Sequence, residues 1–322
     1  MKKDFAFIDA QRQSAHLIRR NGEVKVGEKI TFASGSIEES LQSFKGQYVL
    51  LGIEEDIGPR ANGGFGGAMS AFKAFLSRFL NMQANQFMNT DNLMILGRAK
   101  FECVETEFES LRQAVGEMDE FLTEIIAKIY TYNKVPVVVG GGHNNAYPLM
   151  KAYFQTVGRT LDVVNLDPHA DFRSMEGRHS GNSFSYAKHE GYLNSYTVHG
   201  LHKQYNSQEM LLRMEKEGVI FSCFEHYLDG ERVLWSDAGE YAAIHKEGYG
   251  VELDLDSIEN MPSSAMTPVG WSLFDTRRWL RQLAKENPVY FNFTEGAPDL
   301  DSNGNYKVGK ALAYFVSDLI EK

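Results

Sequence analysis

Three ionisable side chains alternate along Asp167-Pro168-His169-Ala170-Asp171, directly after the apolar run Leu161–Leu166. We expect this run to be a buried strand, and extended backbone beyond it would point alternate side chains to one face. Carboxylates combined with imidazole suit Mn²⁺, Zn²⁺ or Fe²⁺ better than Ca²⁺. Because grouped carboxylates on a buried edge are costly without a cation to compensate them, the segment predicts a metal site.

Two further segments supply ligands of the same kind. Asp254-Leu255-Asp256 ends a second predicted strand, and His143 follows Gly140–Gly142, whose small residues let the backbone turn closely around a site. An isolated Asp-x-Asp is typical of a solvated turn, so the prediction depends on the three segments together. Their donors exceed what one ion needs and suit two ions about 3.5–4 Å apart. The predicted ligands are His143, Asp167, His169, Asp171, Asp254 and Asp256.

Short apolar runs rich in β-branched residues predict the strands that position these ligands. Segments of helical period lie between several runs, for example 108–132 and 273–286, and would cover both faces of a parallel sheet. The alternation predicts a three-layer α/β/α fold. The metal-ligand segments and Glu295 fall at the carboxyl ends of their runs, where open α/β sheets bind ligands. The eight runs are Tyr48–Ile53, Leu93–Leu96, Val135–Val139, Leu161–Leu166, Ser195–His199, Val219–Ser222, Val251–Asp256 and Val289–Phe293.

Composition limits the classes of partner. With 33 basic and 43 acidic residues the formal charge is 33 − 43 = −10, which argues against nucleic-acid and anionic-membrane partners and favours a small molecule. Cys103 and Cys223 lie too far apart for a thiolate metal motif, and no apolar run reaches the ~18 residues of a membrane span. We expect a cytoplasmic chain with a single domain over residues 1–322, in which residues 1 to about 46 form an N-terminal extension packed on it.

Four motifs resemble a known family, the ureohydrolases, which comprises arginases, agmatinases and formiminoglutamases. They are GGGH (Gly140–His143), DPHADFR (Asp167–Arg173), ELDLD (Glu252–Asp256) and FTEGAPDLD (Phe293–Asp301). The resemblance implies an arginase/deacetylase-type fold with an eight-stranded parallel sheet and two Mn²⁺ ions per chain on the six ligands above. It also implies that Glu295 binds the cationic amidine or guanidine of the substrate, and that the chain forms a homo-oligomer, a trimer or hexamer.

Within the family, several details favour formiminoglutamase. GGGH stands where arginases and agmatinases usually have Gly-Gly-Asp-His, and Gly52–Ala68 resembles the D-x-G-x-R-x-N loop of formiminoglutamases. Formiminoglutamate carries two carboxylates, and arginine is the preferred carboxylate clamp. Arg173, Arg60 and Asn62 are therefore the candidate substrate-binding residues, although a surface salt bridge explains Arg60 equally well.

The sequence also departs from the family pattern. Pro168 replaces the usual Ala, Glu252 the usual Ser, and Phe65 an Arg that is common in the glycine-rich loop. The six predicted ligands are unaffected by these changes.

The predicted reaction is hydrolysis of a C–N bond in a linear amidine, N-formimino-L-glutamate and water giving L-glutamate and formamide. Two ions would lower the pKa of a shared water, and Asp171 would pass its proton toward the departing amine. His179 is a candidate proton shuttle, but its interpretation as a surface histidine is favoured. Two alternatives stay open: an arginase- or agmatinase-type hydrolase that releases urea from a guanidine, and a metal-loaded binding or regulatory protein without turnover.

Overall fold

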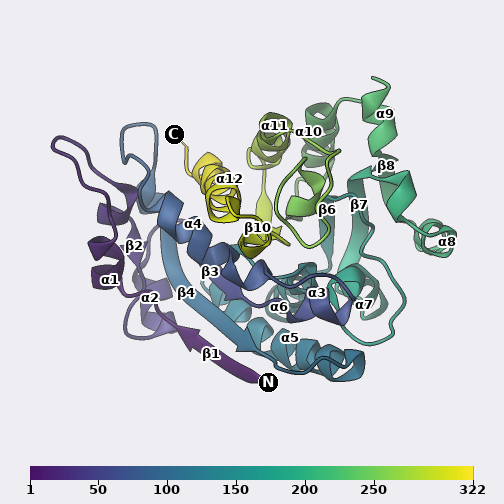
Figure 1. The fold of residues 1–322 in the computed structure, drawn as a ribbon, viewed down its shortest axis with the longest axis horizontal. Helices are drawn as coiled ribbons and strands as arrows, with labels where there is room; N and C mark the ends of the chain where they lie inside the picture. The colour runs from purple at the N-terminus through teal and green to yellow at the C-terminus, as the bar shows by residue number, and fades with distance from the viewer. Residues whose placement is uncertain (322) are drawn as a thin grey trace.

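The computed structural model describes residues 1–321 and gathers ten strands into one sheet (Figure 1). The strand order is β1-β4-β3-β5-β10-β9-β6-β7-β8, with β2 beside β4. Only β1 runs antiparallel to its neighbour, and every other pair in the described chain is parallel. The strands are β1 Lys2–Ala6, β2 Thr31–Phe32, β3 Tyr48–Glu54, β4 Leu93–Glu102, β5 Val135–Val139, β6 Leu161–Leu166, β7 Leu193–Leu201, β8 Ile220–Cys223, β9 Tyr249–Asp254 and β10 Pro288–Thr294.

All eight predicted runs form strands, β3 to β10, but the predicted strand count of eight was wrong. The two additional strands come from the N-terminal segment, where β1 and β2 both pair with β4. β1 reads KKDFA and lies largely exposed, while β2 has two residues, so neither carries the apolar run by which buried strands are found in a sequence. Residues 1 to about 46 therefore extend the edge of the sheet.

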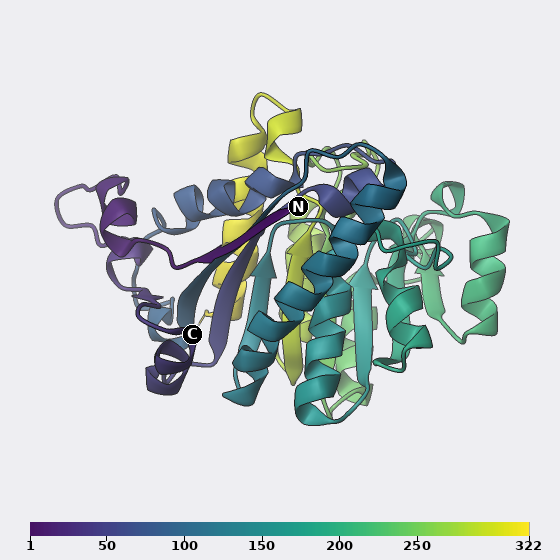
Figure 2. The same ribbon diagram turned by 90° about the horizontal axis from the view of Figure 1, so that it is seen from below.

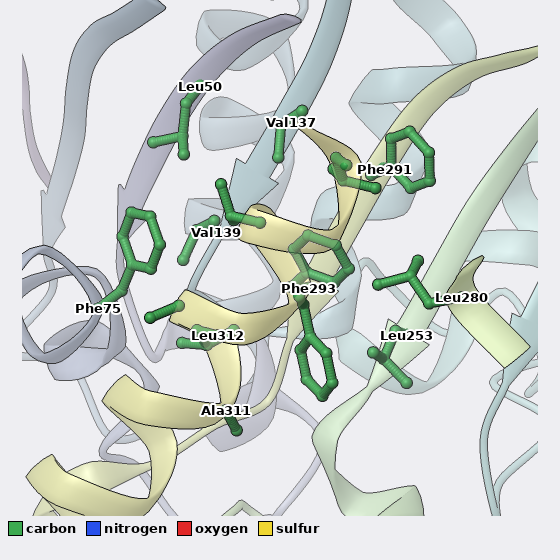
Figure 3. Packing of buried hydrophobic residues seen from close by; sticks show 14 of the residues in the cluster. Leu50, Phe75, Val137, Val139, Leu253, Leu280, Phe291, Phe293, Ala311 and Leu312 are labelled. Carbon is green, nitrogen blue, oxygen red and sulfur yellow. The ribbon is translucent and has the colours of Figure 1, made fainter. Parts of the chain in front are cut away.

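Apolar side chains point to both faces of the central strands. In β5, Val137 and Val139 belong to the core on one face, while Val138 belongs to the core on the other. This alternation explains why the central strands read as unbroken apolar runs, since each face must bury its own row of side chains. Figure 3 shows the first of these cores, with labelled side chains from strands β3, β5, β9 and β10 and from helices α4, α11 and α12.

Helices cover the two faces and complete a three-layer α/β/α arrangement, which confirms the predicted fold class (Figures 1 and 2). Helices α4, α10, α11 and α12 contribute to one core, and α5, α6 and α7 to the other. No helix within residues 1–321 is both long and apolar enough to span a membrane. The helices are α1 Ala10–Ala15, α2 Ile37–Ser43, α3 Ile57–Ala61, α4 Ala71–Phe79, α5 Phe108–Thr131, α6 Ala146–Val157, α7 Ser183–His189, α8 Gln208–Lys216, α9 Phe224–Leu228, α10 Leu234–Ile244, α11 Leu273–Leu283 and α12 Gly304–Leu319.

Candidate metal centre and adjoining cavity

The polar segments singled out in the sequence meet at one edge of the sheet. Strands β5, β10, β9 and β6 are consecutive neighbours, and each is followed at its carboxyl end by one of these segments. His143 follows β5, Glu295 follows β10, Asp254 ends β9 and Asp167 follows β6. Because parallel strands end at the same edge, segments far apart in the chain supply one site.

His143 lies among three carboxylates. Its Nδ1 is 2.9 Å from Asp171 Oδ2, 3.1 Å from Asp254 Oδ2 and 3.2 Å from Asp167 Oδ2. One donor atom from each of these four residues lies within 4.8 Å of the others, a grouping that could hold a metal ion. His143, Asp167 and Asp254 are buried, and 12% of the Asp171 side chain is exposed.

A second group of donors adjoins the first. His169 Nδ1 lies 3.4 Å from Asp167 Oδ1 and 3.7 Å from Asp256 Oδ2. Asp167 therefore presents Oδ2 toward His143 and Oδ1 toward His169. The structure thus brings all six predicted ligands together.

The backbone after β6 and β9 differs from the extended form expected from the sequence. The carboxylate of Asp167 accepts a hydrogen bond from the amide of His169 at 2.7 Å, and that of Asp254 accepts one from the amide of Asp256 at 2.7 Å. Such local bonds turn the chain, so β9 ends at Asp254, and Asp256 lies in a 3₁₀ turn. Asp171 has a left-handed φ of 45°. The ligands converge through turns rather than through alternation along extended strands.

The glycines before His143 have the predicted use. Gly141 has a φ of 75°, and a Cβ there would lie 2.4 Å from Asn145 Nδ2. The amide of Gly142 donates to Glu55 Oε1 at 2.6 Å, and the fully buried Glu55 also accepts from the side chains of Asn144 and Asn145. The buried carboxylate of Glu55, which directly follows β3, thus holds the turn that presents His143.

The electrostatics of the site fit a divalent cation. Burial together with nearby Asp256 and Asp167 raises the pKa of Asp254 well above its ordinary value, and burial and Asp256 raise the pKa of Glu295 to about 8. Burial and Asp167 likewise raise the pKa of Asp171. These shifts express first the burial of the carboxylates and then their mutual repulsion, and bound cations would offset both. The donor set and its charge therefore fit the predicted ions.

A cavity of about 240 Å³ opens from this centre. Its lining includes Arg173, whose side chain is 51% exposed, and Asn62, whose Oδ1 is buried without a hydrogen-bond partner in the described chain. Glu295 also lines it and accepts a hydrogen bond at Oε1 from the His143 amide at 2.7 Å, while its Oε2 has no partner within residues 1–321. The cavity thus offers a bound molecule an amide oxygen, a carboxylate oxygen and the Arg173 guanidinium, whose Nη2 lies 3.8 Å from Glu176 Oε1.

Arg60 is placed differently from Arg173. Its guanidinium donates to the carbonyl oxygens of Cys103 at 3.0 Å and Glu105 at 2.5 Å and lies 3.4 Å from Asp56 Oδ1. It does not belong to the cavity lining that the described residues form. These contacts give Arg60 a local structural role, so we assign it no contact with the substrate.

His179 is fully buried, so its interpretation as a surface histidine was wrong. Its Nδ1 accepts a hydrogen bond from the amide of Gly181 at 3.1 Å, and its Nε2 lies 3.3 Å from Glu176 Oε1 without hydrogen-bond alignment. Burial and the neighbouring guanidinium groups of Arg112 and Arg173 lower the pKa of His179 to about 4. His179 does not line the cavity, whereas the next residue, Ser180, does.

Several residues of the site were not predicted from the sequence. Tyr205 stacks on the ring of His169 at a centroid distance of 5.5 Å and lines the cavity with Met210. Asn206 accepts a hydrogen bond from the amide of Ala170 at 3.0 Å and so holds the loop of ligands. The motif HGLHKQYNS, which contains Tyr205 and Asn206, is the sequence signal that could have identified them. Glu252, noted only as a departure from the family pattern, lies 3.3 Å from His143 Nε2.

Comparisons with known proteins agree with this geometry. Residues 47–319 match the sequence profile of the arginase family. The formimidoylglutamase of Geobacillus sp. (strain WCH70) is 26% identical over 285 residues, which cover 85% of this chain and 83% of that protein.

Two solved structures share the fold at low sequence identity. The formimidoylglutamase of Bacillus subtilis superposes with a TM-score of 0.76 at 17% identity, covering 97% of this chain and 98% of that one. The formiminoglutamase of Trypanosoma cruzi, solved with Mn²⁺, superposes with a TM-score of 0.72 at 18% identity, covering 92% and 99%.

Proposed function

Because this chain belongs to the arginase family, we propose that it is a metal-dependent hydrolase that cleaves N-formimino-L-glutamate into L-glutamate and formamide. The observation that carries the proposal is one cavity that combines the cluster of metal-ligand side chains, the free carboxylate oxygen of Glu295 and the guanidinium of Arg173. The formimidoylglutamases among the similar proteins support the same substrate.

The proposed centre holds two divalent ions, taken to be Mn²⁺. His143, Asp167, Asp171 and Asp254 would hold one ion, since their donor atoms already group together. His169 and Asp256 would hold the other, together with Asp167. When bound, such ions lower the pKa of water at the site and polarise the electrophilic carbon.

Glu295 and Arg173 would orient the two ends of the substrate. The free Oε2 of Glu295 would accept a hydrogen bond from the cationic amidine nitrogen, which is a charge-assisted pair. Arg173 would bind a carboxylate of the glutamate portion, and among the described residues that line the cavity it is the one arginine or lysine. The amide oxygen of Asn62 would accept from a substrate N–H.

Asp171 would move the proton. The oxygen of water forms a bond to the formimino carbon, and the bond from that carbon to the glutamate nitrogen breaks. The Asp171 carboxylate would take the proton that the water loses and deliver it to the departing nitrogen, as general base and then general acid. His179 does not line the cavity, so its ring has no part in this proton transfer.

A substrate screen with the metal-reconstituted protein tests the proposal. N-formimino-L-glutamate, L-arginine and agmatine would be offered at equal concentration after Mn²⁺ loading, and formamide and urea would be measured separately. We expect formamide from the first compound. Urea from a guanidine would indicate the arginase- or agmatinase-type activity, and loaded protein without either product would indicate a binding or regulatory role. The trimer or hexamer stays a prediction, which light scattering would test.

A further inference from the structure

Glu252 is a buried carboxylate on β9 directly beneath the metal-ligand cluster. It is fully buried, and its Oε2 lies 3.3 Å from Nε2 of His143, on the opposite side of the ring from the three aspartates. Nε2 of His143 makes no aligned hydrogen bond among the described residues, and Oε2 of Glu252 is the carboxylate oxygen within reach of it.

The neighbouring strand holds Glu252 in place. Tyr290 donates its hydroxyl to Oε1 at 2.7 Å, and Asn292 donates its side-chain amide to Oε2 at 2.7 Å. Both residues lie on β10, which pairs with β9 in parallel register. Within residues 1–321 no lysine or arginine forms an ion pair with Glu252, and the ring nitrogen of His143 lies within 3.3 Å of its Oε2. Two donors thus fix the Glu252 carboxylate in a buried hydrogen-bond network, with Oε2 directed at the ring of a metal-ligand histidine.

The two ring nitrogens of His143 must have different roles. Nδ1 faces Asp167, Asp171 and Asp254, so it is the nitrogen that would bind an ion, and it can do so only when the ring proton is on Nε2. A buried N–H needs an acceptor, and Glu252 Oε2 is the acceptor in reach. Histidine ligands commonly donate their other N–H to a carboxylate, which fixes the tautomer and raises the basicity of the ligand.

We therefore propose that Glu252 is a positioning residue that holds His143 in the Nε2–H tautomer and strengthens metal binding at Nδ1. The inference rests on the metal centre of the proposed function but is independent of which substrate is hydrolysed.

Metal affinity and ring tautomer test the proposal without any measurement of turnover. Zn²⁺ is the probe, because it is diamagnetic, and its affinity would be measured by competition with a chelator. Glu252→Met removes the acceptor, so affinity should fall by about 10- to 100-fold. Glu252→Gln keeps an acceptor oxygen but loses the charge, so a smaller loss is expected. Tyr249→Phe is the matched control and should leave the affinity unchanged, because it removes a hydroxyl on the same strand that bonds to the Leu283 carbonyl oxygen and not to Glu252.

Nitrogen-15 spectra of histidine-labelled, Zn²⁺-loaded protein give the second readout. The wild type should show His143 protonated at Nε2, and the Nε2-bound proton should shift upfield in Glu252→Gln, because an amide accepts more weakly than a carboxylate. A ring protonated at Nδ1 in the wild type would overturn the proposal. So would a folded Glu252→Met that binds Zn²⁺ as tightly as the wild type. If Glu252→Met does not fold, an unchanged shift of the Nε2-bound proton in Glu252→Gln would overturn the proposal instead.

Discussion

The backbone amide of His143 donates a hydrogen bond to Oε1 of Glu295 at 2.7 Å. This bond joins the turn after β5 to the residue that follows β10, so the position of a metal ligand and that of the proposed amidine-binding carboxylate are fixed together. Glu295 has a left-handed φ of 66°, and its second oxygen is buried without a partner in the described chain. Backbone strain of this kind is typical of functional sites.

Glu295→Gln should separate the two uses of this side chain. The amide oxygen can still accept the bond from the His143 amide, while the charge that would pair with the amidine is lost. A hydrogen bond to a charged group contributes about 1.5–3 kcal/mol, so kcat/KM should fall by roughly 10-fold or more. Metal content, measured by mass spectrometry, should stay at the wild-type level. Loss of metal in this variant would place Glu295 among the ligands instead.

Asp254→Ala and Asp256→Ala should remove metal. Each substitution deletes a carboxylate from the centre and also relieves repulsion in the metal-free protein, so activity should fall far more than the free energy of unfolding. The wild type should bind two divalent ions per chain, counted by titration. Asp301→Ala is the control, because that carboxylate pairs with Lys307 outside the cluster. A single tight ion with no second site at millimolar Mn²⁺ would contradict the binuclear centre.

Much of the site could be predicted because metal ligands are local signals. The sequence shows two such signals directly, the alternating acids and histidine after β6 and the Asp-x-Asp at the end of β9. The apolar runs before them place both at one edge of the sheet. The turns were not predictable from a binary pattern, because Asp167 and Asp254 bend the chain through bonds from their own side chains. Strand β1 was missed because an exposed edge strand needs no apolar face.

Long-range contacts explain the remaining differences. Arg173 is favoured locally because it follows Asp171 by two residues, but only the fold shows that Arg60 meets the carbonyl oxygens of Cys103 and Glu105. In the same way, Glu252 reads as an ordinary strand residue until β10 and the turn after β5 bring Tyr290 and His143 against it.

Arg173 should set the preference for a substrate that carries carboxylates. Arg173→Lys keeps the charge but loses the planar fork, and Arg173→Met loses both, so kcat/KM on formiminoglutamate should fall in that order. Truncation of one partner of a desolvated charge pair costs roughly 2–5 kcal/mol, and because the Arg173 side chain is 51% exposed we expect the lower end of that range, a fall of about 30-fold in the Met variant. Metal content should not change. Wild-type kinetics in the Met variant would remove Arg173 from the substrate site.

Acid should destabilise the protein through His179. Its pKa is about 4 in the folded chain against an ordinary 6.5, so between these values the unfolded chain takes up a proton that the folded chain does not. The stabilisation is therefore complete above pH 6.5 and is lost as pH falls toward 4, by about 3 kcal/mol in total. His179→Asn keeps an acceptor for the Gly181 amide without titrating.

The measurement is the free energy of unfolding of the wild type and of His179→Asn at several pH values. The difference between the two isolates His179 from the other titrating groups, including the buried His199, whose pKa burial lowers to about 4. The wild type should lose more stability than the variant between pH 7 and pH 4. Parallel curves would show that His179 does not titrate in this window.

The central claim is that this centre hydrolyses a formimino C–N bond. The most direct measurement follows N-formimino-L-glutamate by proton NMR with the Mn²⁺-loaded protein, and compares kcat/KM with that for agmatine, which has no carboxylate. Formamide and L-glutamate should form in equal amounts, chelation should abolish turnover, and kcat/KM should be higher for formiminoglutamate. Faster release of urea from agmatine, unaffected by Arg173→Met, would contradict it.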